Sequence, residues 1–448
     1  MPEPADLSLR DAAAALAAGD LTASELTDAC LERAAATEDL GAFAVVRPDD
    51  ARRDAAARDG ERREGARGPL HGIPAAIKDL VDVAGLPTRA GSAATDAAPA
   101  ARDAPVVTLM REAGTVVIGK TATHEFGYGV TTRTARNPWD RDRLAGGSSG
   151  GSAVAVAVGA CPLALGSDTA GSCRIPAALC GVAGMMGRPG RLPLEGAVPL
   201  APGLDAIGFL ARTAADLALA WSALTGEAVA IPSAHPPALR VATPPEAALG
   251  PVEPAALQAA EAVAESLARG GGRRGIAATP DFGDFARPRG TLIGALALAE
   301  HRRRGWWPGR AGRYGAAVAG EMRAAEDIRP EDVRAARDRL AALASELRLA
   351  LEGFDVLVLP VTPGAAPPRD TGESLELSER IHAANMTRLC GPVNIAGLAA
   401  VSIFGGLDAD GLPLGVQVVA RDEVTALAAA AAHEALAGPP PRPPSARA

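Results

Sequence analysis

Lysine is almost absent from this chain of 448 residues, which contains two lysines, Lys78 and Lys120, against 43 arginines. Because arginine supplies positive charge nearly everywhere, a lysine that remains indicates a task that a guanidinium cannot perform. Loss of a proton is such a task, since burial can lower the pKa of an ammonium by several units. Lys78 ends an apolar run that predicts a buried strand, so its amine has the character of a base.

Two clusters of glycine and serine supply hydroxyl groups that such a base could serve. They occupy residues 146–152 (GGSSGGS) and 166–172 (GSDTAGS). Pro176 suits the first turn of a helix, which places Ser172 near a helix N-terminus. Exposed backbone N–H groups there favour a developing anion, and the small residues Ala170 and Gly171 let a carbonyl group approach closely. The pattern predicts a nucleophilic serine beside an oxyanion hole.

Three motifs in this order resemble the amidase signature family. They are GIPAAIKDLVDVAGLPTRAGS around Lys78, the GGSSGGS cluster, and GSDTAGSCRIPAALCG. A stretch between Asn394 and Gln417 is similar to the closing motif of that family, and the resemblance covers about residues 5–438. It implies an α/β fold with a mixed central β-sheet that is flanked by helices on both faces.

The resemblance implies an amidohydrolase that cleaves the C–N bond of a linear carboxamide through an acyl-enzyme, without a metal or cofactor. Ser172 matches the nucleophile and Lys78 matches the base. Ser148 matches the bridging serine, which follows a cis peptide bond in the family. A neutral Lys78 would take a proton from Ser148, which takes one from Ser172 during attack on the carbonyl.

The resemblance also assigns binding and supporting positions. The oxyanion hole and acyl site are expected at Thr169, Ala170, Gly171, Ser172 and Gly127. The residues expected to support the catalytic loop are Ser149, Asp168 and Arg174. The chain departs from the family at Ala170, where a glycine is common, although relatives that act on allophanate-like substrates share the TAGS form. It departs again at residues 184–189, where Met186 takes a usual lysine position, which leaves the local packing open.

Other functions fit parts of the sequence. One is the amidase subunit of a glutamine-dependent amidotransferase, which passes ammonia to a partner. Another is a catalytically degenerate scaffold, which Ala170 and the altered 184–189 segment favour and the three catalytic matches oppose. The pattern Gly146-x-Ser148-x-Gly150 also fits a nucleophile elbow with His433 downstream, but that motif alone is weak.

Two further clusters receive structural interpretations. Lys120 follows a strand, but no G-x-x-x-x-G-K pattern precedes it, so a structural role is favoured over a phosphate loop. Residues 302–308 (RRRGWWP) are interpreted as a helix end and loop, with a rim for an anionic or planar substrate as the alternative.

Composition limits partners and location. A formal net charge of −8 disfavours nucleic acid and anionic membranes as partners. The resemblance implies that the partner is a small-molecule amide substrate. Five cysteines without a C-x-x-C pair indicate reduced thiols, and the histidines show no metal spacing. With no signal-peptide pattern at the N-terminus, the expected location is the cytoplasm. Oligomeric state is left open, with a homodimer as one alternative.

Caps and periodicity predict the organisation of the chain. Ser8 and Gly19 would bound a first helix, and Thr22 with Glu25 forms a capping-box pattern. Strands are expected at 69–78, 115–119, 355–360, 401–405 and 416–420, and residues 153–165 are expected to form a buried helix that leads into a strand. Helices are expected at 106–113, 214–224, 291–304, 315–325, 330–352 and 423–436.

A single domain is expected over residues 1–438. It would comprise N-terminal helices (1–65), a catalytic core (66–212) and a variable substrate-side region (225–350). Prolines at 232, 236, 237, 244 and 245 and glycines at 270–272 indicate a subdomain boundary or surface connections. The proline-rich tail, 439–448, is expected to be extended or disordered.

Overall fold

The computed structural model describes residues 3–62, 65–231, 238–269, 271–369 and 375–446, except for the side chains of 375–379. The prolines at 232–237 and Gly270 lie outside the described residues, so the expected boundary there, like the division at 65, 212 and 225, stays a prediction.

Eleven strands of the described chain form one sheet in the order β1-β3-β2-β4-β6-β5-β10-β11-β9-β7-β8. The strands are β1 (Phe43–Val46), β2 (Pro74–Lys78), β3 (Val116–Thr121), β4 (Leu163–Asp168), β5 (Ala183–Met186), β6 (Ala206–Ala211), β7 (Arg240–Thr243), β8 (Arg273–Ile276), β9 (Val356–Pro360), β10 (Ala399–Leu407) and β11 (Pro413–Ala420). Both parallel and antiparallel pairs occur, so the sheet is mixed.

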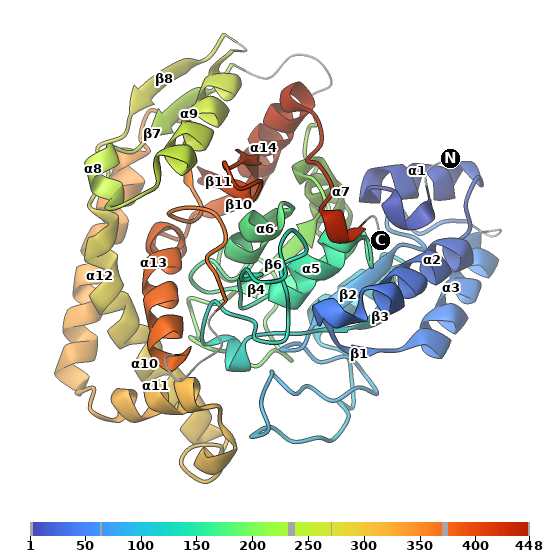
Figure 1. Ribbon diagram of the computed structural model, residues 1–448, viewed down its shortest axis with the longest axis horizontal. Coiled ribbons are helices and arrows are strands. Elements are labelled where there is room, and N and C mark those ends of the chain that lie inside the picture. The colour runs from blue at the N-terminus through green and yellow to red at the C-terminus, as the bar shows by residue number, and fades with distance from the viewer. Residues whose placement is uncertain (1–2, 63–64, 232–237, 270, 370–374, 447–448) are drawn as a thin grey trace.

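Helices cover both faces of this sheet (Figure 1). They are α1 (Leu9–Ala18), α2 (Ala23–Ala36), α3 (Pro48–Arg62), α4 (Pro105–Glu112), α5 (Gly150–Val158), α6 (Arg174–Cys180), α7 (Ala214–Thr225), α8 (Glu246–Leu249), α9 (Pro254–Ala268), α10 (Ala286–Arg303), α11 (Ala316–Glu326), α12 (Pro330–Ala350), α13 (Leu375–Ile395) and α14 (Glu423–Ala437). Short 3₁₀ turns lie at Pro4–Asp6, Glu38–Leu40, Glu125–Gly127, Phe282–Phe285, Ala311–Arg313 and Pro444–Ala446. The expected fold class is confirmed.

Local chemistry explains the first two helices. The Ser8 hydroxyl accepts from the backbone of Asp11 at the start of α1, and Gly19 ends that helix in the left-handed conformation. Thr22 and Glu25 make the reciprocal bonds of a capping box at the start of α2. Both predictions are confirmed because such caps depend on neighbours in sequence alone.

The expected strands and helices are present with shifted ends. The altered 184–189 segment contributes to β5, which pairs with β6 and β10, so a regular ladder continues through Met186. No helix in the described part of the chain is long and apolar enough to cross a bilayer.

The carboxyl-terminal tail differs from the expectation of an extended or disordered segment. Pro444–Ala446 form a 3₁₀ turn, and the Ala446 carbonyl accepts from the Arg33 guanidinium at 3.0 Å. Arg442 forms an ion pair with Asp6. Arg33 and Asp6 lie near the N-terminus, so the composition of the carboxyl-terminal tail could not predict that the tail contacts them. Figure 1 shows the carboxyl end beside the N-terminal helices.

The carboxyl ends of two neighbouring parallel strands carry the first polar side chains of interest. Strand β2 pairs in parallel with β4, with Ala75 opposite Leu163 and Ile77 opposite Leu165. Lys78 and Ser167 therefore emerge at the same edge of the sheet, where α/β folds commonly place their sites.

Candidate active site

Lys78 is the last residue of β2 and its side chain is completely buried. Its Nζ lies 2.7 Å from the Ser148 Oγ and 2.9 Å from the Ser167 Oγ, with a longer contact of 3.4 Å to the Ser167 carbonyl. No carboxylate forms an ion pair with this amine among the described residues. An amine held only by neutral oxygens has little to keep it protonated.

Burial lowers the pKa of Lys78 to about 8 from an ordinary value of 10.5. The negative charges of Asp168 and Asp205 act in the opposite direction, but they do not outweigh the loss of hydration. A substantial fraction of this amine is therefore neutral near physiological pH, as a general base requires.

Ser148 is held by its backbone so that its hydroxyl faces Lys78. The peptide bond between Gly147 and Ser148 is cis. The Ser148 carbonyl accepts from the His124 N–H at 3.1 Å and from the Thr132 hydroxyl at 3.2 Å. Helix α5 begins two residues later, and the same Thr132 hydroxyl accepts from its first N–H, that of Gly150. The loop and the start of the helix thus share one anchor.

Ser172 lies in the loop between β4 and α6, and only 7% of the residue is exposed. Its carbonyl accepts from the Ser149 N–H at 3.0 Å, which joins the two serine loops directly. Among the described residues, no hydrogen bond joins the Ser172 hydroxyl to Ser148 or Lys78. Rotation about one serine torsion between staggered positions is enough to reorient that hydroxyl, and catalytic hydrogen bonds often tighten only when substrate is bound.

A buried ion pair shapes the loop that carries Ser172. Arg174 and Asp168 are both completely buried, and Arg174 Nη2 lies 3.0 Å from Asp168 Oδ1. Burial alone would raise the pKa of Asp168, but the charge of Arg174 and hydrogen bonds from Arg174 and Asn394 lower it to about 2. The carboxylate also accepts the N–H groups of Gly171 and Cys173 at 2.7 and 3.0 Å. The Asp168 carboxylate therefore fixes the backbone conformation of the loop that contains Ser172.

That contact changes the expected set of oxyanion donors. The N–H of Gly171 donates to the Asp168 carboxylate at 2.7 Å. For Ala170 and Ser172, no backbone N–H partner is found in the described part of the chain. Thr169 is held by its hydroxyl, which donates to Asp205 at 2.6 Å. The backbone N–H of Thr169 also has no partner among the described residues, so the loop leaves N–H groups at Thr169, Ala170 and Ser172 for a developing negative charge.

Gly127 lies next to the Ser148 hydroxyl, in the 3₁₀ turn Glu125–Gly127. A Cβ on Gly127 would be 3.5 Å from the Ser148 Oγ, and its φ of +70° is one that side chains rarely adopt. The preceding Phe126 also has a positive φ, 53°. Its ring is buried against Trp306 and Tyr314, which secures this unfavourable backbone conformation.

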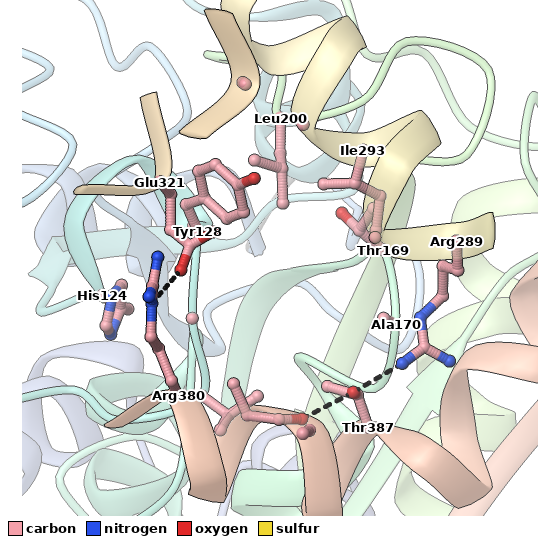
Figure 2. A pocket seen from close by; sticks show the side chains of 18 of the residues that line it. His124, Tyr128, Thr169, Ala170, Leu200, Arg289, Ile293, Glu321, Arg380 and Thr387 are labelled. Carbon is pink, nitrogen blue, oxygen red and sulfur yellow. Dashed lines mark hydrogen bonds and ion pairs between the residues drawn. The ribbon is translucent and has the colours of Figure 1, made fainter. Parts of the chain in front are cut away.

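A cavity of about 520 Å³ opens over the Ser172 loop. Its wall includes Gly127, Thr169, Ala170 and Ser172 from the expected site. The far wall comes from helices α10, α11 and α13, as Figure 2 shows with Ile293, Glu321 and Thr387. The cavity joins the candidate nucleophile to the variable region expected to select substrate.

The other candidates from the sequence, Lys120, His433 and residues 302–308, lie away from the cavity in environments that indicate structural roles. Lys120 is buried in an ion pair with Asp79, with 2.7 Å between Nζ and Oδ1, as the structural interpretation predicted. His433 lies in α14 and does not line the cavity. Trp306 and Trp307 are buried in an aromatic cluster and are also absent from the cavity wall, which supports the helix-end interpretation of 302–308.

Ser167 is a site residue that sequence reasoning missed. Its hydroxyl is within hydrogen-bond distance of the Lys78 amine, and its carbonyl accepts from the Ser149 hydroxyl at 3.2 Å. The signal was its place inside the GSDTAGS motif, at the end of a strand parallel to that of Lys78. Met186 was also unassigned, and its sulfur lies 3.4 Å from Arg174 Nη2, so the altered segment contacts the guanidinium that holds the Ser172 loop.

Comparison with known proteins decides the family. The Amidase family matches residues 25–271 and 317–424. The chain belongs to the amidase family. It is 36% identical to a 2-amino-5-chloromuconic acid deaminase of Comamonas testosteroni, over 97% of each chain. It is 34% identical to a subunit of the glutamyl-tRNA(Gln) amidotransferase of Chloroflexus aggregans, over 96% of each.

A solved structure described as an amidase superimposes with a TM-score of 0.86 at 33% identity, and covers 96% of this chain and 100% of its own. The fold is therefore that of an amidase over nearly the whole chain. The chain is a hydrolase that acts on amide C–N bonds.

Proposed function

We propose that this amidase cleaves a linear carboxamide through an acyl-enzyme on Ser172, with Ser148 and Lys78 as the proton relay. The observation that carries the proposal is the distance of 2.7 Å between the Lys78 amine and the Ser148 hydroxyl, in a site where the amine has no acidic contact among the described residues. A neutral amine can accept a proton from Ser148, and Ser148 can accept one from Ser172 as it attacks the carbonyl.

Each step balances within the site. Attack forms a bond between the Ser172 oxygen and the amide carbon, and the proton of Ser172 passes through Ser148 to Lys78. Collapse of the tetrahedral intermediate breaks the C–N bond, and the same proton returns to the leaving nitrogen. Water then adds to the acyl-enzyme by the same route and releases the acid and free Ser172.

Backbone donors stabilise the oxyanion in this proposal. In the described part of the loop, the backbone N–H groups of Thr169, Ala170 and Ser172 are without a partner, and each such donor typically lowers the barrier by about 3 kcal/mol. The N–H of Gly171 instead maintains the loop through Asp168. Alanine at position 170 is compatible with this role because a backbone N–H, not a side chain, is the donor.

A fluorophosphonate probe tests the assignment of the nucleophile. We expect the probe to label the protein at Ser172, as read by peptide mass spectrometry, and Ser172→Ala to abolish the labelling and amide hydrolysis together. Ser152→Ala is a matched control, because Ser152 lies in the first serine cluster but donates to the Leu165 carbonyl inside the core. Labelling that persists in Ser172→Ala would refute the proposed nucleophile, and an unreactive wild-type protein would favour the degenerate scaffold.

A second candidate function follows from one relative, the glutamyl-tRNA(Gln) amidotransferase subunit of Chloroflexus aggregans. If this chain had that role, glutamine hydrolysis would depend on a partner that receives the ammonia. Hydrolysis of simple amides by the purified chain alone, at a rate that added lysate does not raise, would speak against this alternative. We favour the independent amidohydrolase, which acts on a small molecule in the cytoplasm. The five cysteines are all buried free thiols, which suits a reducing compartment.

A further inference from the structure

The far wall of the active-site cavity contains a buried arginine, Arg289, with few hydrogen-bond partners. Arg289 belongs to helix α10 and lines the same cavity as Ser172 and Ala170. Only 5% of the residue is exposed. Figure 2 shows its side chain reaching from α10 toward Thr387 on α13.

A single hydrogen bond fixes the Arg289 guanidinium within the described structure. Its Nη2 donates to the Thr387 hydroxyl at 2.8 Å, and that hydroxyl in turn donates to the Ala383 carbonyl at 2.6 Å. Nη1 is buried and has no partner among the described residues. A Cβ on Gly391 would lie 2.1 Å from Nη1, so the glycine makes room for the guanidinium. The cation is thus positioned by its surroundings but largely unsatisfied.

No acidic side chain among the described residues neutralises Arg289. Glu321 lies in the same cavity, but it forms an ion pair with Arg380 at 2.7 Å (Figure 2). Burial lowers the pKa of Arg289 to about 10, so the guanidinium still carries its charge at neutral pH. A buried charge without a partner is strongly disfavoured, and proteins keep one where a ligand supplies the counter-charge.

We propose that Arg289 is the receptor for a carboxylate on the substrate, so that this enzyme acts on amides that bear a second, anionic group. The rest of the wall fits a short apolar spacer between the two groups, because Ile293, Gly294, Ala325 and Ile328 line it. A planar guanidinium also matches the geometry of a carboxylate better than an ammonium does. This inference rests on the proposed function, since it takes Ser172 as the point of attack.

Matched pairs of amides test the proposal. In the first arm the carboxylate is on the acyl part, as in succinamate and glutaramate, whose neutral counterparts are 4-methylpentanamide and 5-methylhexanamide. In the second arm it is on the leaving amine, as in N-acetylglycine against N-isobutylacetamide. We expect the wild-type enzyme to prefer the anionic member of at least one pair by about tenfold or more in kcat/KM, and the preferred arm locates Arg289 relative to the scissile bond.

The decisive measurement is the ratio of kcat/KM between the two members of a pair. We expect Arg289→Gln to lower the ratio by at least about 30-fold, because the neutral side chain removes the counter-charge. Thr387→Val, which removes the hydroxyl that positions the guanidinium, should lower it in the same direction by a smaller factor. Arg388→Gln is the control, since Arg388 is the next residue on α13 but donates to the Pro251 carbonyl outside the cavity, and its ratio should stay within about threefold.

A binding measurement tests the proposal even if none of these amides is a substrate of the enzyme. Succinate and glutarate should slow fluorophosphonate labelling of Ser172 in the wild type and lose this protection in Arg289→Gln. A wild type with no preference in any pair and no protection by either diacid would overturn the carboxylate receptor, as would a ratio that Arg289→Gln leaves unchanged. Absence of both labelling and hydrolysis would instead refute the proposed nucleophile, so the two failures are distinguishable.

Discussion

At the scale of single residues, the two lysines show how environment decides chemistry. Lys120 lies against the Asp79 carboxylate, and that ion pair joins β3 to the segment after β2. Lys78 is equally buried but contacts only hydroxyl and carbonyl oxygens of the described residues. The same amine is therefore a structural cation in one place and suited to be a base in the other, because Lys120 is in direct contact with a carboxylate and Lys78 contacts none among the described residues.

The pH dependence of turnover follows from that difference. Burial lowers the pKa of Lys78 to about 8, and the proposed proton relay requires the neutral amine. We expect kcat/KM to rise about tenfold per pH unit below that value and to level off above it, since Asp168, with a pKa of about 2, stays ionised throughout. A pH–rate profile from about 5 to 9.5 measures this. Lys78→Arg should lose activity by about 10³-fold or more, and near-normal turnover in that variant would remove the lysine from the mechanism.

At the scale of elements, the Arg174–Asp168 pair connects parts of the chain that are far apart in sequence. Besides Asp168 at the end of β4, the Arg174 guanidinium donates to Gln417 on β11 at 2.9 Å and to Asn394 on α13. The loop with Ser172 lies directly between Asp168 and Arg174. Its conformation is therefore held by the sheet and by α13 together.

Removal of this cation should damage both stability and catalysis. We expect Arg174→Met to lower the free energy of unfolding by about 3–5 kcal/mol, because the buried Asp168 carboxylate loses its counter-charge. The double variant Arg174→Met/Asp168→Asn should recover part of this stability and little of the activity, since Asp168 also holds the N–H groups of Gly171 and Cys173. Urea denaturation with parallel kcat/KM measurements checks both, and a fully stable Arg174→Met would contradict the assignment.

At the scale of the whole molecule, the described part of the carboxyl-terminal tail packs against the N-terminal helices. Figure 1 shows helices α10 to α12 on one side and α1 to α3 on the other, with the carboxyl terminus beside the latter. Arg33 donates to the Val158 carbonyl at 2.8 Å and to the Ala446 carbonyl at 3.0 Å. One buried guanidinium thus joins α2, the end of α5 and the tail.

Truncation after Gly438 tests this role of the tail. The deletion removes the Arg442–Asp6 ion pair and one of the carbonyl acceptors of Arg33. We expect a loss of about 1–3 kcal/mol of stability with kcat/KM nearly unchanged, because the tail does not line the cavity. Thermal unfolding at a fixed scan rate measures the loss, and an unchanged midpoint would show that the tail contacts contribute nothing.

Prediction from sequence worked best where the cause is local. The caps of α1 and α2 involve residues three apart, and the apolar strands β9 and β11 are evident from their composition. Four-residue strands such as β5 and β7 went unpredicted, because each is short and has one of its two partners, β10 for β5 and β9 for β7, more than a hundred residues away. The engagement of the Gly171 N–H by Asp168 was missed for a similar reason, since a motif gives spacing and not the direction of an N–H.

The sequence alone determined the kind of reaction, because a lysine retained among arginines and two ordered glycine–serine clusters specify groups that chemistry requires. Only the tertiary structure decided which neighbours those groups have. It placed Ser167 against Lys78, closed the loop with Asp168, and left Arg289 in the cavity without an acid among the described residues. Charge state and substrate preference depend on such contacts between distant segments, and these contacts exist only once the sheet and helices have packed.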